Sequence, residues 1–162
     1  MRKVLLVLTL MLSLASVFPA LAKTPYMSSE ELQTESQRGF EEILDLWRDG
    51  RFEELYARTM ASGRSSKEQF AKKLSSASRK PACCWEKMQE VKVSVRNDST
   101  VTLRAKLGFE AGQTGTDYTT RSFKLQKEDG VWRISQSDIL SLAGAAKKKG
   151  HHRVRKSKES NH

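Results

Sequence analysis

Two adjacent cysteines, Cys83 and Cys84, are the residues whose type and spacing most directly suggest chemistry. Neighbouring Cα atoms lie about 3.8 Å apart across a trans peptide, which is shorter than the usual separation across a disulfide. Three outcomes follow: a redox-active ring between the two sulfurs, bridging to another molecule, or two unbridged thiols of which one is buried at the start of a strand. Two cysteines cannot complete the closed four-ligand shell of a structural zinc site. The sequence therefore predicts no metal site here and marks the pair as candidate redox residues.

Histidine is missing from the part of the chain that is expected to fold. The three histidines all lie close to the C-terminus, as His151, His152 and His162. This distribution argues against a histidine general base and against a histidine-based metal site in the domain. Several aspartates fall at positions typical of helix surfaces, turns and caps, namely Asp45, Asp98, Asp129 and Asp138.

Positive charge is concentrated at the two ends of the chain. The formal net charge is +10, of which Arg2 and Lys3 supply two units. The segment 143–162 supplies six units, because Glu159 offsets one of its seven basic residues, so that 23–142 retains only +2. The basic residues of this tail are Lys147, Lys148, Lys149, Arg153, Arg155, Lys156 and Lys158. Such a block attracts anionic surfaces. The sequence predicts that the tail binds an anionic envelope surface, and that the domain has no specific nucleic-acid partner.

Residues 1–22 have the three parts of a secretory signal peptide. Arg2 and Lys3 are followed by the apolar run 4–14, and Ala20-Leu21-Ala22 supplies the small residues of a cleavage site. The apolar run is shorter than the about 20 residues of a transmembrane helix. We therefore expect a periplasmic or secreted protein whose mature chain has no transmembrane span.

The first half of the mature chain has the spacing of amphipathic helices. Residues 28–49 predict a long helix, with Ser28 and Glu31 as a capping box. A shorter helix is expected over 52–60, followed by a third helix that Ser65 caps. The apolar stripe of the long helix consists of Leu32, Ser36, Phe40, Ile43, Leu44 and Trp47.

From Trp85 onward, apolar and polar residues alternate, which is the pattern of half-buried strands. Four strands are expected, over 91–96, 101–109, 118–126 and 131–135. Asp129-Gly130 is the strongest hairpin signal in the chain. Asp138 is expected to cap a last helix over 139–146.

These elements predict an α+β fold in which three N-terminal helices pack on a curved four-stranded antiparallel sheet. The expected organisation is a signal peptide at 1–22, a flexible leader at 23–28, one domain at 29–142 and a basic disordered tail at 143–162.

Two segments resemble proteins of the nuclear-transport-factor-2-like superfamily. They are Phe40–Tyr56, FEEILDLWRDGRFEELY, and Phe123–Ile134, FKLQKEDGVWRI. In that superfamily a long helix ends in a short acidic-Gly turn before a second helix, and the last hairpin has a Trp-Arg pair after its Asp-Gly turn. The resemblance covers roughly residues 29–142. It implies a cone-shaped fold, and the chain is similar to exported bacterial members of unknown function.

The resemblance implies two uses of the cone. The superfamily includes isomerases, dehydratases and polyketide cyclases, which aim an acid or base into the interior. For such an enzyme, Asp117 and Tyr118 are the best polar pair. A small apolar ligand is the other use. The candidate ligand-binding residues are Trp47, Tyr56, Asp117, Tyr118 and Phe123, although ordinary core packing also explains the aromatic ones.

From these patterns we expect an exported, non-enzymatic binding or interaction module without a cofactor. The alternatives are a small-molecule isomerase or dehydratase of the same fold, and an envelope protein tethered electrostatically by its tail. Two copies could also pair through the sheet face. The interior distinguishes the first two hypotheses. A buried, unpaired carboxylate favours an enzyme, whereas a filled apolar interior favours a binding module.

Overall fold

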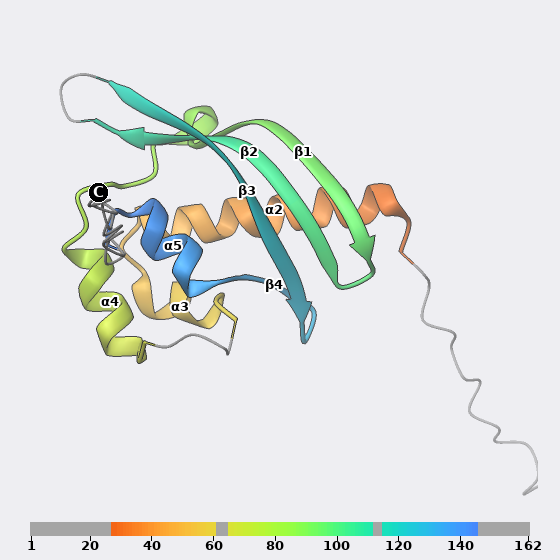
Figure 1. Cartoon of the computed structure of the whole chain (residues 1–162), viewed down its shortest axis with the longest axis horizontal. Helices are drawn as coiled ribbons and strands as arrows, with labels where there is room; N and C mark the ends of the chain where they lie inside the picture. The colour runs from red at the N-terminus through yellow and green to blue at the C-terminus, as the bar shows by residue number, and fades with distance from the viewer. Residues whose placement is uncertain (1–26, 61–64, 112–114, 146–162) are drawn as a thin grey trace, which may run out of the picture.

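The computed structural model describes residues 27–60, 65–111 and 115–145 as an α+β fold with one four-stranded antiparallel sheet. The predicted signal peptide and nearly all of the leader and tail lie outside these residues. The elements are α2 (Ser29–Arg48), α3 (Phe52–Ala57), α4 (Lys67–Ser75), the 3₁₀ turn η2 (Cys84–Lys87), β1 (Met88–Asn97), β2 (Thr100–Glu110), β3 (Thr116–Glu128), β4 (Val131–Ile134) and α5 (Gln136–Leu142) (Figure 1).

The long helix α2 has the N-terminus and the buried face that the sequence predicts. The backbone N–H of Glu31 donates to the Ser28 hydroxyl over 3.2 Å, and the Ser28 N–H donates to the Glu31 carboxylate over 2.7 Å. This reciprocal pair is a capping box, which satisfies two N–H groups that lack helical partners. All six residues of the predicted stripe are buried.

The predicted start of α4 was wrong by one residue. Ser66, and not Ser65, is the cap, because its hydroxyl accepts a hydrogen bond from the Gln69 N–H. The Ser65 N–H instead donates to the side chain of Gln136, 71 residues away. A tertiary contact therefore decides between two neighbouring serines that are equally good caps.

The predicted cap of α5 was also wrong. Ser135 caps the helix by accepting from the Asp138 N–H, and its hydroxyl donates to the Asp138 carboxylate over 2.7 Å. Helix α5 therefore begins directly after β4. Similarly, α3 ends before Met60, whose N–H donates to the carbonyl of Ile134 in the sheet.

The sheet has the strand order β1-β2-β3-β4, and each strand pairs with its sequence neighbour. Leu103 lies opposite Phe123. The buried face of these two strands consists of Val101, Leu103, Ala105, Leu107, Phe109, Phe123 and Leu125. The predicted Asp129-Gly130 turn is confirmed. Both residues have positive φ, 52° and 77°, as a two-residue type I′ hairpin requires.

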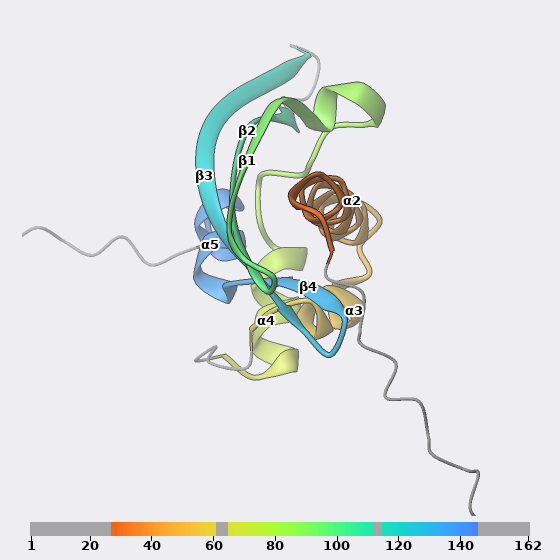
Figure 2. The same ribbon diagram turned by 90° about the vertical axis from the view of Figure 1, so that its right-hand side faces the viewer.

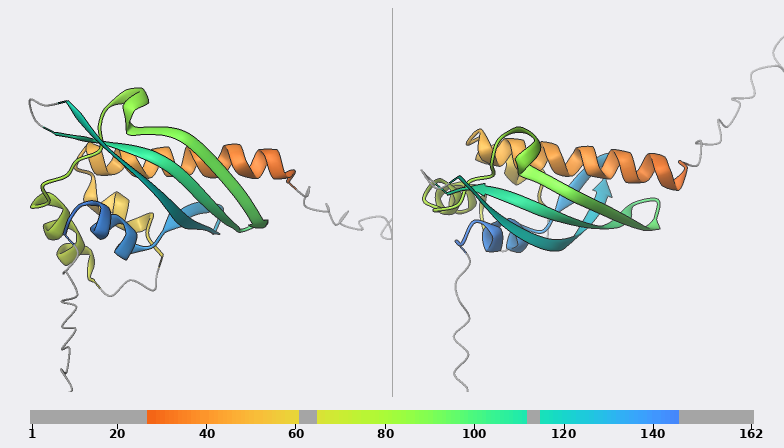
Figure 3. Two further views of the ribbon diagram at one scale, coloured as in Figure 1. Left: turned by 45° about the horizontal axis from the view of Figure 1, so that its top comes forward. Right: turned by 90° about the horizontal axis from the view of Figure 1, so that it is seen from above.

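The core lies between the sheet and α2. The strands bend around α2 (Figure 2), and α2 runs beside β1 along the sheet (Figure 3). Helices α3, α4 and α5 gather at one end of the molecule (Figure 1). We call the face of the sheet that is turned away from α2 the outer face.

Gly39 allows α2 to approach β4 closely. An ideal Cβ atom at this position would lie 2.9 Å from the Cβ of Trp132. We expect Gly39→Ala to lower the free energy of unfolding by about 1–3 kcal/mol, because the added methyl group must displace a buried ring. Alanine has the higher helix propensity, so Thr34→Ala on the exposed side of α2 should be neutral or slightly stabilising. Urea denaturation measures both, and a more stable Gly39→Ala variant would contradict the packing.

Candidate functional site

The space between α2 and the sheet is filled with apolar side chains. Trp47 and Phe123, two of the predicted ligand-binding residues, are each only 2% exposed. The Trp47 ring lies 5.7 Å from that of Phe109, and the Phe123 ring lies 5.0 Å from that of Phe40. These are distances of packed aromatic pairs. In this structure the two residues serve as core.

The other three predicted ligand-binding residues do not converge on them. Consecutive residues of a strand point to opposite faces of the sheet. Asp117 and Tyr118 are consecutive in β3, so their side chains leave opposite faces, and both are exposed. Tyr56 lies on α3 and lines a surface groove with Thr59 and Gln136. The structure therefore does not bring Asp117 and Tyr118 together as a catalytic pair.

Tyr118 belongs instead to a cluster at the end of the sheet. Its hydroxyl donates to Glu86 over 3.3 Å, and the hydroxyl of Thr116 donates to the same carboxylate over 3.2 Å. The Nζ of Lys106 lies 4.5 Å from the centre of the Tyr118 ring, within the range of a cation–π contact.

Gly108 allows η2 to lie against this cluster. An ideal Cβ at Gly108 would come within 2.3 Å of the Glu86 carbonyl oxygen, so only glycine fits at this position of β2. The same Cβ would approach the side chains of Thr116 and Tyr118. Glu86 therefore crosses the outer face of the sheet at this point.

The two cysteines and an exposed tryptophan lie on the same turn. Cys83 and Cys84 are solvent-exposed, and their sulfurs are joined as a vicinal disulfide. Cys84 has a φ of 59°, a left-handed conformation that is rare for residues other than glycine. Trp85 follows with 72% of its surface exposed, and Tyr118 is 40% exposed. We call these two residues the aromatic end.

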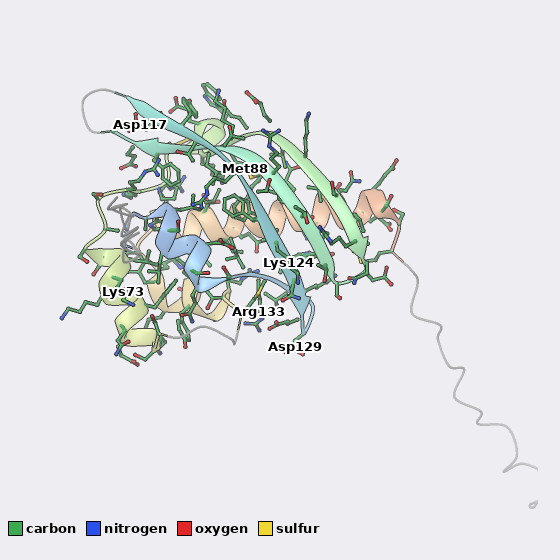
Figure 4. All side chains as sticks on the ribbon, viewed as in Figure 1. Lys73, Met88, Asp117, Lys124, Asp129 and Arg133 are labelled. Atoms are coloured by element: carbon green, nitrogen blue, oxygen red, sulfur yellow. A yellow bond between two sulfur atoms is a disulfide. The ribbon has the colours of Figure 1, made fainter. Side chains whose placement is uncertain are left out.

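Beyond the aromatic end, the outer face is basic. We consider its ten central outward positions, which are Lys92, Ser94, Arg96, Thr102, Arg104, Lys106, Tyr118, Thr120, Ser122 and Lys124. Five of them are Lys or Arg, and none is Asp or Glu. In Figure 4, Lys124 lies on the half of β3 remote from Asp117. The acidic residues nearest to these positions are Glu86 on η2, which accepts the hydrogen bond from Tyr118, residues at strand ends, and Glu90 in the bulge of β1, which contacts Lys106 over 3.6 Å.

Two of these basic residues face each other. Lys92 on β1 is the direct cross-strand partner of Arg104 on β2. Directly opposed side chains of this kind have Cβ atoms about 5 Å apart, and like charges at that distance destabilise a sheet. Both side chains are exposed, and neither forms an ion pair within the described ranges. The fold therefore tolerates an electrostatic cost at this position.

Helices α2 and α3 have the opposite charge. Helix α2 carries six carboxylates against two arginines, and α3 adds Glu53 and Glu54. The net +2 of residues 23–142 therefore conceals a separation of the acidic helices α2 and α3 from a basic outer face, while α4 carries three lysines against one glutamate.

Hydrogen bonds and ion pairs on the helices explain the pKa shifts that are resolved. The hydrogen bonds from Arg51 hold the pKa of the Glu54 carboxyl below its usual value. Hydrogen bonds from its own backbone N–H and from Ser66 lower the pKa of Glu68. These side chains lie on the surface, where the surrounding water weakens such interactions. They stabilise helix ends and do not indicate chemistry.

Two other kinds of site find no support in the described ranges. No group of three or more His, Cys, Asp or Glu residues is placed to hold a metal ion there. Within the same residues, no helix combines the length and apolar character that crossing a membrane requires.

Comparison with known proteins does not assign a function to the chain. No protein-family model matches the chain, and no curated protein matches it.

Sequence reasoning named Tyr118 and the two cysteines as candidates, but it did not name Glu86, Trp85 or the basic outer face. The alternation of the strands already placed Lys92, Arg96, Arg104 and Lys106 on polar faces. A count of charge by strand face, and not by domain, would have found the basic surface.

Proposed function

We propose that this chain is an exported, non-enzymatic binding module of the nuclear-transport-factor-2-like type, and that it binds an anionic partner through the outer face of its sheet. The apolar packing of Trp47 and Phe123 supports a module over an enzyme, because it puts aromatic rings where a catalytic acid or base would stand. The domain would then bind its partner through its surface and not through its interior.

The observation that carries the proposal is the cross-strand pair of Lys92 and Arg104. Lys106 lies two residues beyond Arg104 on β2, and Lys124 lies on the adjacent strand β3. Both lysines are on the same face of the sheet as the pair and add positive charge beside it. An anionic partner would neutralise this repulsion. Charge brought together in this way raises the local concentration of anions and speeds association. Serine and threonine hydroxyls between the basic residues add hydrogen-bond donors.

The same charges make a homodimer through the outer face unfavourable. A two-fold interface brings the same surface of both copies together, so that Lys92 and Arg104 would meet their own equivalents. Like charges across an interface suppress association. Pairing of two copies therefore requires another surface or a bridging anion.

Heparin, a soluble polyanion, tests the proposal. Each basic residue near an anionic surface contributes about 1 kcal/mol, so we expect the triple variant Lys92→Gln, Arg104→Gln, Lys124→Gln to bind about 10- to 100-fold more weakly at low salt. The measurement is a binding isotherm for the mature protein, combined with the salt concentration at which it elutes from a heparin column.

The matched control removes the same number of charges elsewhere. Arg38→Gln, Lys72→Gln and Lys73→Gln change exposed basic residues of α2 and α4 that form no ion pair in the described part of the chain. This variant has the same net charge as the outer-face variant, and its affinity should fall by less than about threefold. Equal losses in the two variants would mean that net charge alone governs binding, and would refute a role for the outer face.

A further inference from the structure

We infer that the anionic partner is a phospholipid bilayer, on which the outer face lies against the headgroups while Trp85 and Tyr118 enter the interfacial layer. The inference rests on the proposed function, since it names the partner of the same basic surface. It also gives a role to the aromatic end, because binding of a soluble polyanion would need only the basic residues.

Trp85 is exposed on a turn that the sheet holds in place. The carbonyl of Glu86 lies against Gly108, and the carboxylate of Glu86 accepts hydrogen bonds from Thr116 and Tyr118. These contacts fix the backbone next to Trp85 while 72% of the Trp85 surface stays accessible. Leaving a large apolar ring in water has a free-energy cost. The fixed, exposed indole ring of Trp85 therefore has a lower free energy in a partly apolar environment than in water.

Tyr118 gives the aromatic end the mixed character of the bilayer interface. Its ring is 40% exposed and lies beneath the Nζ of Lys106, at 4.5 Å from the ring centre. Tryptophan and tyrosine are enriched at membrane interfaces, because each combines an apolar ring with a polar group. Lys106 continues this end into the basic surface, where anionic headgroups attract lysine and arginine. The aromatic end would therefore insert into the interfacial layer, while the basic outer face would contact the anionic headgroups.

The positions of the aromatic residues favour lipid over nucleic acid. Sheets that bind single-stranded RNA place aromatic side chains in the middle of the strands, so that bases stack on them. Here the central outward positions of β1 and β2 are polar or basic, and both aromatic residues lie at one end. Insertion of that end, with the basic side chains of the outer face turned to the headgroups, uses all of these residues at once.

Vesicles test the inference with Trp85 as the native probe. Trp47 and Trp132 are each 2% exposed, so iodide quenches mainly Trp85. With vesicles of phosphatidylcholine and phosphatidylglycerol in a ratio of about 7:3, we expect mature protein to co-sediment and Trp85 to become protected from iodide. With vesicles of pure phosphatidylcholine, the protein should not co-sediment and Trp85 should stay accessible to iodide. We expect Trp85→Ser to weaken vesicle binding about tenfold and to leave heparin binding unchanged, whereas Trp85→Phe stays within about threefold of wild type. Circular dichroism checks that each variant is folded.

The outcomes separate this inference from the proposed function. Heparin binding without vesicle binding would overturn the lipid partner and leave the anionic module standing. Absence of both would overturn the proposed function itself. Vesicle binding in which Trp85 stays open to iodide, or in which Trp85→Ser behaves like wild type, would overturn the aromatic anchor. Tight binding of a single-stranded oligonucleotide, with Trp85 quenched and no vesicle binding, would assign the surface to nucleic acid instead.

Discussion

Replacing Trp132 with alanine should lower the free energy of unfolding by about 3–5 kcal/mol, the usual loss when a large aromatic side chain is removed from a core. Trp132 is 2% exposed, and its Cβ and ring lie against Gly39 in the middle of α2. Its strand β4 is short and pairs with the end of β3, and Ile134 also forms a bridge with Thr59, so the Trp132 ring is a main link between that hairpin and α2. Urea denaturation followed by far-UV circular dichroism measures the loss.

Trp132→Phe is the matched control for this prediction. Phenylalanine keeps an aromatic ring in the same place, and the indole N–H of Trp132 has no hydrogen-bond acceptor among the described residues, so no hydrogen bond is lost. We expect a loss of about 1–2 kcal/mol, mainly from the volume that the smaller ring leaves empty. A loss below 1 kcal/mol for Trp132→Ala would contradict the observed strand register, because a shift by one residue moves the side chain to the other face.

The sequence predicted the elements well wherever burial follows a simple period. The stripe of α2 repeats at helical spacing and the strands alternate, so both patterns report which side faces the core. The predictions failed at Ser65 and Asp138, where two polar residues close together could both cap a helix. At Ser65 a contact with the remote residue Gln136 decided the case, and local sequence does not contain that information. At α5 the decision is local, because Ser135 lies three residues before Asp138 and caps the helix by accepting from the Asp138 N–H.

The candidate site was predictable only in part, for reasons that differ between its residues. Alternation places Lys92 and Arg104 on the polar faces of their strands, but it does not place them opposite each other. That pairing depends on the register of the β1–β2 hairpin, which shifts between Val95 and Asn97 close to its turn. The Tyr118–Glu86 contact joins residues 32 positions apart, and the turn that carries Glu86 has no periodic pattern.

The basic tail and the basic outer face should both contribute to binding of anionic vesicles, and removing either set of charges should weaken that binding strongly. At about 1 kcal/mol per basic residue near an anionic surface, either set of charges contributes to binding of anionic vesicles. We expect glutamine at the seven basic tail residues between Lys147 and Lys158 to weaken binding about 10²- to 10³-fold at low salt. Glutamine at the five basic residues of the outer face should have a similar effect.

Combining the two sets should reduce vesicle binding by at least about 10⁴-fold, because separate groups of charges contribute almost additively to the binding free energy. Co-sedimentation of the mature protein and the three variants between low and high salt measures this. Each single variant should retain binding that salt weakens, since the remaining set still interacts through screened charges. Complete loss in the tail variant alone would mean that the outer face does not contribute. An outer-face variant that binds like wild type would mean the same, because the tail would then account for all of the affinity.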